Sequence, residues 1–315
     1  MVCETQAFRT TSYALKTMQN KDAFSGYHPI VNFLYFCFVL AFAMIFTHPV
    51  CTVFSLLCAF VYSIHLSGVK AVRFTFLYML PLLIIAALLN PAFNHQGGTI
   101  LTYLPDGNPL TLESIMYGVA AAAMLITVIT WFACLNAVFT SDKFVYIFGR
   151  IIPALSLIFA MALRFVPRFK AQFKVISAAQ RCVGRDVSNG NILRRVKHGI
   201  IIISIMVTWA LENAIESADS MKSRGYGLPG RTAFSIYRFD KRDRNALIFI
   251  LACAAYIITG HFTGGLYFRY FPTIKGLWDS PYAISIFAVY LALGATPLIL
   301  NIREEIKWNS IKAKT

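Results

Sequence analysis

Charged residues, and acidic residues above all, are scarce in this sequence. Only 14% of its 315 residues are charged, and 14 Asp and Glu stand against 29 Lys and Arg. Apolar residues make up 57% of the chain, and the mean hydropathy of +0.62 is outside the range of soluble globular proteins. The composition therefore predicts a polytopic membrane protein.

The sequence also lacks the short motifs of several common active sites. It has no G-x-x-x-x-G-K-[ST] phosphate loop, no H-E-x-x-H zinc motif and no G-x-S-x-G nucleophile turn. Its seven cysteines form no C-x-x-C pair, and five lie in apolar runs, which is typical of small core residues rather than disulfides. The six histidines are scattered along the chain. We therefore expect neither a metal site nor a cofactor.

Six apolar runs are each near the length needed to cross about 30 Å of hydrocarbon. They lie at 30–47, 49–66, 74–90, 115–139, 245–260 and 283–301. None of them contains Asp, Glu, Lys or Arg, whereas ion-driven carriers usually place an ionisable residue inside the membrane. An autonomous carrier is therefore disfavoured, and any transport would draw its energy from another protein.

Basic residues alternate between the two sides of these runs. Arg9, Lys16 and Lys21 precede the first run, the 91–114 loop has no Lys or Arg, and 141–245 carries eighteen Lys and Arg against seven Asp and Glu. The positive-inside rule then places both termini in the cytoplasm. This bias and one basic cytoplasmic block explain the net charge of +15, so no nucleic acid partner is needed.

The predicted fold is an all-α polytopic membrane protein with about six transmembrane helices and a cytoplasmic domain of long amphipathic helices. Turn residues between two short β-prone runs, 99–104 and 109–113, also predict a small extracellular β-hairpin. The predicted parts are a cytoplasmic lead-in at 1–29, a four-helix membrane part at 30–140, a basic cytoplasmic domain at 141–244, C-terminal membrane helices at 245–302 and a cytoplasmic tail at 303–315. The lead-in is polar or mixed, so no signal peptide is expected.

Two amphipathic helices are predicted in the basic block, at 164–183 and 199–224. Each ends at a glycine, in the tips Cys182-Val183-Gly184 and Ser223-Arg224-Gly225. A basic residue before such a glycine is ordinary capping, because the C-terminus of a helix is partly negative. Two similar tips, however, indicate a helical pair that docks on another protein.

The apolar faces of these two helices are candidates for a similar contact. The faces carry Phe165, Phe169, Phe173 and Ile176 on the first helix, and Ile203, Val207, Ala210, Ala214, Ala218 and Met221 on the second. The alanines recur at intervals of four, which permits close helix crossing. Two apolar runs in the block, 151–163 and 199–211, are each about 13 residues long, which suits helices buried against others or lying at the interface. Counting both as spans would preserve the orientation, so topology leaves their place open.

Residues 218–226, Ala-Asp-Ser-Met-Lys-Ser-Arg-Gly-Tyr, resemble a pattern A-x-x-M-x-A-R-G-Y. It marks the transmembrane T component of energy-coupling factor (ECF) transporters, which import vitamins and transition-metal ions in prokaryotes. Residues 163–167 and 108–113 are similar to other segments of that family, and the resemblance extends over roughly 25–305. It implies a prokaryotic cell-membrane protein that performs no catalysis itself.

The resemblance also implies partners for the tips and the apolar faces. A T component transmits the ATP-driven motion of two ATPase subunits to a membrane S component, which binds and selects the substrate. One ATPase would meet Ser223, Arg224 and Gly225, and the other Cys182, Val183 and Gly184. The S component would face Phe169, Phe173, Ile176, Val207, Ala210, Ala214 and Ala218.

The first tip departs from the family pattern, because Val183 stands where an arginine is expected. Either Arg181 or Arg185 takes over the charge, or this tip docks by apolar contact alone. Equal use of the two tips is therefore an open question at this point.

Two other classes of function compete with this interpretation. A membrane-embedded lipid-modifying transferase could hold a phosphate or lipid head group in the basic block. It would need a carboxylate cluster, and the compact acidic group Glu212, Glu216 and Asp219 is more typical of a solvated helix face. A structural membrane protein without transport activity is the third class.

Overall fold

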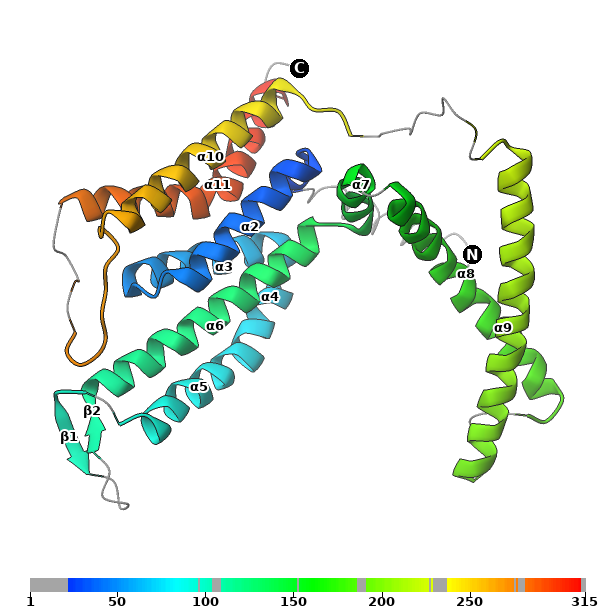
Figure 1. Cartoon of the computed structure of the whole chain (residues 1–315), viewed down its shortest axis with the longest axis horizontal. Helices are drawn as coiled ribbons and strands as arrows, with labels where there is room; N and C mark the ends of the chain where they lie inside the picture. Colours follow the sequence, from blue (N-terminus) through cyan, green and yellow to red (C-terminus); the bar gives the residue numbers. More distant parts are fainter. Residues whose placement is uncertain are drawn as a thin grey trace. The chain divides into compact units, whose positions relative to one another are not determined.

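The computed structural model describes residues 22–95, 97–103, 109–151, 153–185, 191–226, 228, 237–274, 276 and 281–312, without the side chains of 149–157. The chain divides into two units, which are described separately. Unit 1 comprises 1–140 and 237–315, and unit 2 comprises 141–236. Figure 1 shows the elements of both.

Unit 1 is a helical bundle with one small hairpin. Its helical elements are η1 (Phe24–Gly26), α2 (Pro29–Ile45), α3 (Pro49–Ser67), α4 (Val69–Phe74), the π-helical turn η2 (Thr75–Met79), α5 (Leu80–Phe93), α6 (Leu112–Val138), α10 (Lys241–Phe262) and α11 (Pro281–Lys312). Strands β1 (Ile100–Tyr103) and β2 (Pro109–Thr111) pair antiparallel. The predicted hairpin is thus present. Unit 2 contains α7 (Ser141–Ile151), α8 (Pro153–Cys182) and α9 (Ile192–Ser223).

Among the described residues, six helices are long and apolar enough to cross a membrane, namely α3, the continuous segment Val69–Phe93, α6, α9, α10 and α11. The prediction of an all-α polytopic membrane protein is confirmed, although the set differs from the six predicted runs. The first run forms α2, whose 17 residues cover only about 26 Å. Conversely, α9 joins the set because the run 199–211 continues in a single 32-residue helix.

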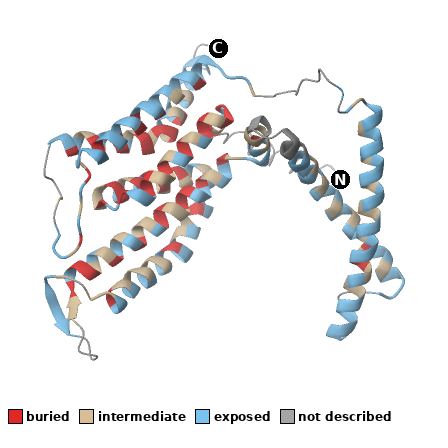
Figure 2. Ribbon diagram, viewed as in Figure 1, coloured by how far each residue is buried: buried red, intermediate tan, exposed pale blue. Residues whose placement is uncertain are grey.

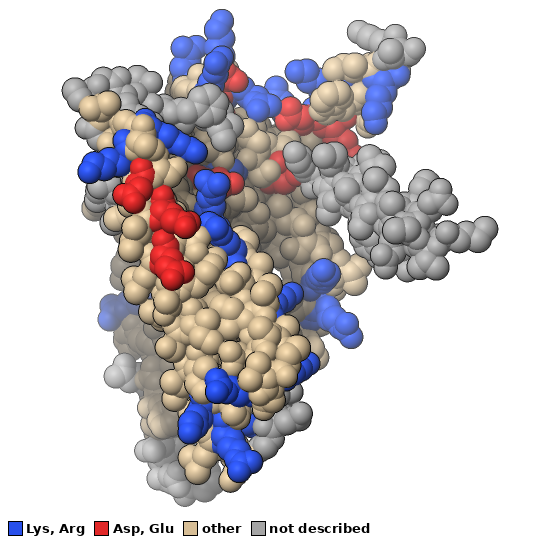
Figure 3. Space-filling model, turned by 90° about the vertical axis from the view of Figure 1, so that its right-hand side faces the viewer, with Lys and Arg blue, Asp and Glu red and all other residues tan. Residues whose placement is uncertain are grey.

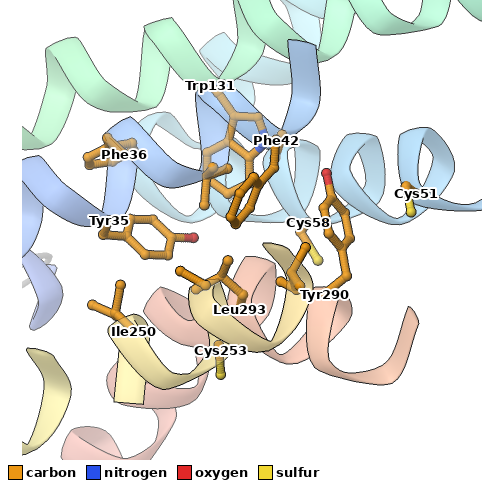
Figure 4. Close-up of a cluster of buried hydrophobic side chains, with 14 of the residues drawn as sticks. Tyr35, Phe36, Phe42, Cys51, Cys58, Trp131, Ile250, Cys253, Tyr290 and Leu293 are labelled. Atoms are coloured by element: carbon orange, nitrogen blue, oxygen red, sulfur yellow. The ribbon is translucent and has the colours of Figure 1, made fainter. Parts of the chain in front are cut away.

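The core of unit 1 brings together α2, α3, α6, α10 and α11 (Figures 2 and 4). Trp131 on α6 is fully buried, and its indole N–H donates to Ser55 Oγ on α3 at 2.9 Å. The ring of Tyr35 on α2 meets Trp131 edge-on at 6.1 Å between centroids, and its hydroxyl donates to the Gly294 carbonyl of α11 at 3.1 Å. These aromatic side chains satisfy their polar atoms inside the core, so they join helices at little desolvation cost.

Residues 22–28, within the predicted lead-in, pack into this core. Phe24 is fully buried, and Asp22 accepts a hydrogen bond from the Tyr62 hydroxyl of α3 at 2.7 Å. Asn301 of α11 donates to the other Asp22 oxygen and accepts from the backbone N–H of Ala23 at 2.7 Å and of Phe24 at 3.3 Å. The segment before α2 is therefore joined to α3 and α11.

The loop before α6 is held by a buried carboxylate. Glu113 is 3% exposed and accepts from the backbone N–H of Thr99 at 3.2–3.3 Å. Gly97, with φ of +154°, lies so close that a Cβ there would be 2.6 Å from Glu113 Oε2. Further along α6, a Cβ on Gly118 would be 2.6 Å from the Ala87 carbonyl of α5, so only glycine permits this close helix contact.

Candidate functional site

Helices α8 and α9 of unit 2 form an antiparallel pair. The ring of Phe169 on α8 meets Trp209 on α9 nearly perpendicular, with centroids 5.5 Å apart. The Arg168 guanidinium lies 5.6 Å from the centroid of the same Trp209 ring. Ile176 on α8 and Ile202 on α9 are also buried, at 8% and 1% exposure. An aromatic and aliphatic seam therefore holds the two helices together.

Both helices start earlier than the sequence analysis predicts. α8 begins at Pro153 instead of residue 164, and α9 begins at Ile192 instead of 199. From Pro153 on, the predicted apolar run continues directly into the amphipathic part of α8, and Pro167 lies inside the helix without ending it. At the start of α9, the Asn191 side chain accepts from the Ile192 N–H at 2.8 Å, which supplies the cap that fixes the boundary.

The two helices end in the same backbone motif. At the α8 tip, Arg185 N–H donates to Gln180 O at 2.9 Å and Gly184 N–H to Arg181 O at 3.0 Å. At the α9 tip, Tyr226 N–H donates to Met221 O and Gly225 N–H to Lys222 O, both at 3.0 Å. Gly184 and Gly225 have φ of +77° and +74°. This is the Schellman cap, and it places Val183 and Arg224 at equivalent positions.

The tips carry their positive charges at different places within this motif. Both have an exposed basic residue two positions before the capping one, Arg181 in α8 and Lys222 in α9. Arg224 adds a charge at the cap of α9, whereas Arg185 adds one two residues further along in α8. Cys182 and Ser223 occupy the last helical position of each tip, and both are exposed. The Val183 side chain is 68% exposed, so the α8 tip has an exposed apolar side chain at the capping position.

The predicted apolar face divides between two environments. Phe169, Ile176 and Ala210 are half-buried or buried in unit 2, and the first two belong to the seam described above. Ala214 and Ala218 line a groove of about 360 Å³ together with Met161 and Phe165 of α8. Phe173 and Val207 are exposed at 48% and 52%. Ala214 and Ala218 therefore face the α8–α9 groove, whereas Phe173 and Val207 point outward.

A second apolar stripe lies on α9; it shares Ile203 and Val207 with the predicted face and adds three residues that the sequence analysis does not name. Its members are Ile200, Ile203, Val207, Leu211 and Ile215, which are 52–63% exposed. Their spacing of three, four, four and four places them on one helix face. Figure 3 shows a band without charged side chains on unit 2, with basic side chains toward both ends. The spacing of the large aliphatic side chains is the sequence signal for this stripe. The sequence analysis instead places the partner-facing surface on the neighbouring face that carries the alanines.

The acidic group Glu212, Glu216 and Asp219 lies exposed on α9. Figure 3 shows acidic side chains in a line along one side of the helix. Within the described ranges, no group of three or more His, Cys, Asp or Glu side chains is placed to hold a metal ion. The three carboxylates thus form a solvated face of the helix.

The two capping glycines provide a test of the tip geometry. Gly184→Ala and Gly225→Ala are each expected to destabilise their caps by about 1–2 kcal/mol, because a side chain disfavours positive φ. A Cβ at Gly225 would also lie 2.9 Å from Leu228 Cδ1, whereas nothing lies within 4 Å at Gly184, so Gly225→Ala should cost more. Hydrogen exchange at the amides of Arg185 and Tyr226 should accelerate by about 5- to 30-fold.

Gly199→Ala is the matched control for these substitutions. Gly199 lies inside α9 with open space around its Cβ position, so alanine there should maintain or increase helix stability. Equal exchange rates at the tips in all three variants would contradict the role of the glycine caps.

Comparison with known proteins gives consistent matches. The sequence pattern of the CbiQ family, described as cobalt transport protein, matches residues 27–236. The ECF transporter transmembrane protein EcfT of Bacillus selenitireducens is 33% identical over 112 residues, which are 35% of this chain and 42% of that protein. EcfT 1 of Listeria monocytogenes is 27% identical over 209 residues, 62% of this chain and 73% of that protein.

The matches differ in how much of each relative they include. EcfT of Streptococcus thermophilus is 27% identical over 220 residues, which are 65% of this chain and 80% of that protein. With the Bacillus protein, the chain spans less than half of the relative's length. The family pattern, in contrast, covers about two thirds of this chain and includes unit 2 up to residue 236. This multi-pass membrane protein therefore belongs to the family of transmembrane T components of ECF transporters.

Proposed function

We propose that this protein is the coupling subunit of an ECF importer in a prokaryotic cell membrane. In this role it transmits movement from two ATPase subunits to a membrane S component that binds a vitamin or a metal ion. The protein itself performs no catalysis, and its partners hydrolyse the ATP. Both termini and the α8 and α9 tips lie on the cytoplasmic side in this arrangement.

The observation that carries the proposal is the pair of equivalent caps. Two partners of similar shape need two similar contact points, and both α8 and α9 end in a Schellman cap with an exposed side chain at the capping position. A helix C-terminus presents carbonyl groups and a partial negative charge, which stabilise an adjacent guanidinium. That guanidinium can in turn form a bidentate contact with a partner's carboxylate.

The difference between the tips indicates that the two ATPases make chemically different contacts with α8 and α9. Arg224 offers a cation at the α9 cap, whereas Val183 offers a small apolar side chain at the equivalent point of α8. We infer that the ATPase meeting α9 has an acidic groove. The ATPase meeting α8 offers acceptors to Arg181 or Arg185, which take over the charge that Arg224 supplies on α9.

The exposed stripe on α9 supports the proposed contact with the S component. Five aliphatic side chains at helical spacing form a continuous apolar surface, and such surfaces on a helix fit an apolar partner helix. Of the residues predicted to face the S component, Phe173 and Val207 are exposed and can make this contact. Ile200, Leu211 and Ile215 extend the proposed contact surface. Ile176 and Phe169 hold α8 to α9 and thus support this surface from behind.

Affinity purification of the tagged full chain in mild detergent, followed by mass spectrometry, tests the proposal. We expect two ATPase subunits and one small hydrophobic membrane protein to accompany the chain, and the identity of that protein to indicate the substrate. A double variant with charge-reversed tips, R224E and R181E, should lose the ATPases and retain the membrane partner. A chain that purifies stably without any ATPase would overturn the proposal and favour the transferase alternative.

A further inference from the structure

A cavity of about 630 Å³ lies in unit 1, between the start of α10 and the second half of α11. Its lining changes character along its length. One part is apolar, with Ala246 and Phe249 from α10 and Ile299 and Leu300 from α11. The other part is basic, with Arg242, Arg303 and Lys307.

This change coincides with the boundary of the membrane-spanning segments. On α11 the apolar run ends at Asn301 and charged residues begin at Arg303. On α10 the first four residues, Lys-Arg-Asp-Arg, precede the apolar run from Ala246. Cations at such positions are characteristic of the interface between hydrocarbon and water. The apolar part of the cavity therefore lies at acyl-chain depth and the basic part at head-group depth.

The geometry of the basic part leaves an excess of positive charge. Arg242 Nη1 lies 3.1 Å from Glu304 Oε1, and its guanidinium is 4.6 Å from the centroid of the Tyr27 ring. These contacts fix Arg242 at one wall. Glu304 is the acidic member of the described lining, so three cations and one anion give a net charge of +2.

The apolar part is open to the bilayer. Phe249 is 45% exposed and Ile299 is 44% exposed, although both lie within helices that cross the membrane by length and composition. A free phosphate ion would gain nothing from these side chains. A lipid would use both parts, because its phosphate would meet the cations and an acyl chain would cover the apolar wall.

We propose that this cavity binds an anionic phospholipid. Arg303 and Lys307 contact the phosphate, Arg242 supports them from the opposite wall, and one acyl chain lies against Phe249 and Ile299. The lipid thereby joins the exposed ends of α10 and α11, which the Arg242–Glu304 ion pair also connects. The proposal concerns unit 1 alone and includes none of the tip residues.

Native mass spectrometry of the purified full chain, titrated with phosphatidylglycerol or phosphatidylcholine in detergent, tests this site. We expect selective retention of phosphatidylglycerol. The double variant R303A/K307A should bind it about 30-fold more weakly, since each cation near the membrane surface contributes about fivefold. The residues are exposed, so the variant should fold.

The matched control is the double variant K70A/R73A. Lys70 and Arg73 are exposed cations on α4, they precede an apolar segment in the same way, and they lie outside the cavity. Their removal changes the net charge equally and should leave phosphatidylglycerol binding within about twofold of the wild type. Equal losses in both double variants would reduce the effect to general surface charge and overturn the proposal.

Two further arms separate a lipid from a free anion. Phe249→Ser keeps all cations but removes apolar wall, and should weaken phosphatidylglycerol binding by about tenfold. Inorganic phosphate at millimolar concentration should not displace the lipid. Displacement by phosphate, unchanged binding in F249S, or equal affinity for phosphatidylcholine would each contradict an anionic phospholipid site.

Discussion

Arg224→Ala is expected to abolish most ATP-driven uptake while the protein still inserts into the membrane. Arg224 is exposed at the cap of α9, where its backbone N–H donates to Ser220 O at 3.3 Å, so truncating the side chain leaves this cap bond in place. Truncating one partner of a partly desolvated charge pair costs about 2–5 kcal/mol, which corresponds to a loss of about 30- to 4,000-fold in affinity for the ATPase. Uptake of the identified substrate in vesicles measures the effect.

Lys222→Ala is the matched control for this prediction. Lys222 is an exposed cation on the same tip, two residues before Arg224, but it precedes the cap and points from a different part of the last turn. Its removal should reduce uptake far less, as expected for an exposed charge. Normal uptake with Arg224→Ala, or equal losses in both variants, would remove Arg224 from the mechanism.

Val183→Arg extends the same test to the α8 tip. The equivalent caps mean that the new guanidinium would occupy the position that Arg224 has on α9. If Arg181 or Arg185 merely substitutes for a missing cap charge, this variant should couple as well as the wild type or better. Loss of one ATPase from the purified complex would show instead that the partner groove is apolar.

Asn301→Ala is expected to reduce the free energy of unfolding of unit 1 by about 3–5 kcal/mol. Its side chain is 6% exposed, donates to the Asp22 carboxylate and accepts from the N–H groups of Ala23 and Phe24. Alanine would leave a buried carboxylate with one partner fewer and two donors unsatisfied, and such groups are costly. Denaturation in mixed detergent and urea, and proteolysis near residue 22, measure the loss.

Two variants calibrate this result. Asn309→Ala removes an exposed asparagine from the same helix and should leave stability unchanged within about 0.5 kcal/mol. Tyr62→Phe removes a single hydrogen bond to Asp22 and should cost about 1–3 kcal/mol. If Asn301→Ala behaves like Asn309→Ala, the polar cluster does not stabilise the N-terminal segment.

Several features were predictable because their signals are local in the sequence. Charge-free apolar runs identified a polytopic helical membrane protein, since a backbone in hydrocarbon must satisfy its hydrogen bonds within helices. The glycines at 184 and 225 marked both helix ends, since each lies at a positive φ that glycine adopts readily. Turn residues between β-prone runs identified the hairpin.

Other features needed tertiary contacts that no local pattern contains. Asp22 and Asn301 are 279 residues apart and meet only because α11 packs beside η1. The alanines of α9 have a periodicity that fits either a partner helix or α8, and only the structure shows that Ala214 and Ala218 line a groove with Met161 and Phe165 of α8. Helix α9 is a candidate membrane span because it is 32 residues long, whereas the apolar run in the sequence is only about 13 residues.

The sequence by itself determined the class of the protein, the family pattern at 218–226 and the positions of the two tips. These depend on composition and on hydrogen bonds that close within six residues of backbone. Only the tertiary structure decided which apolar side chains remain exposed on α9, and which cations and apolar residues surround one cavity between α10 and α11. The physical reason is that exposure depends on neighbours from other helices, which periodicity along one helix does not specify.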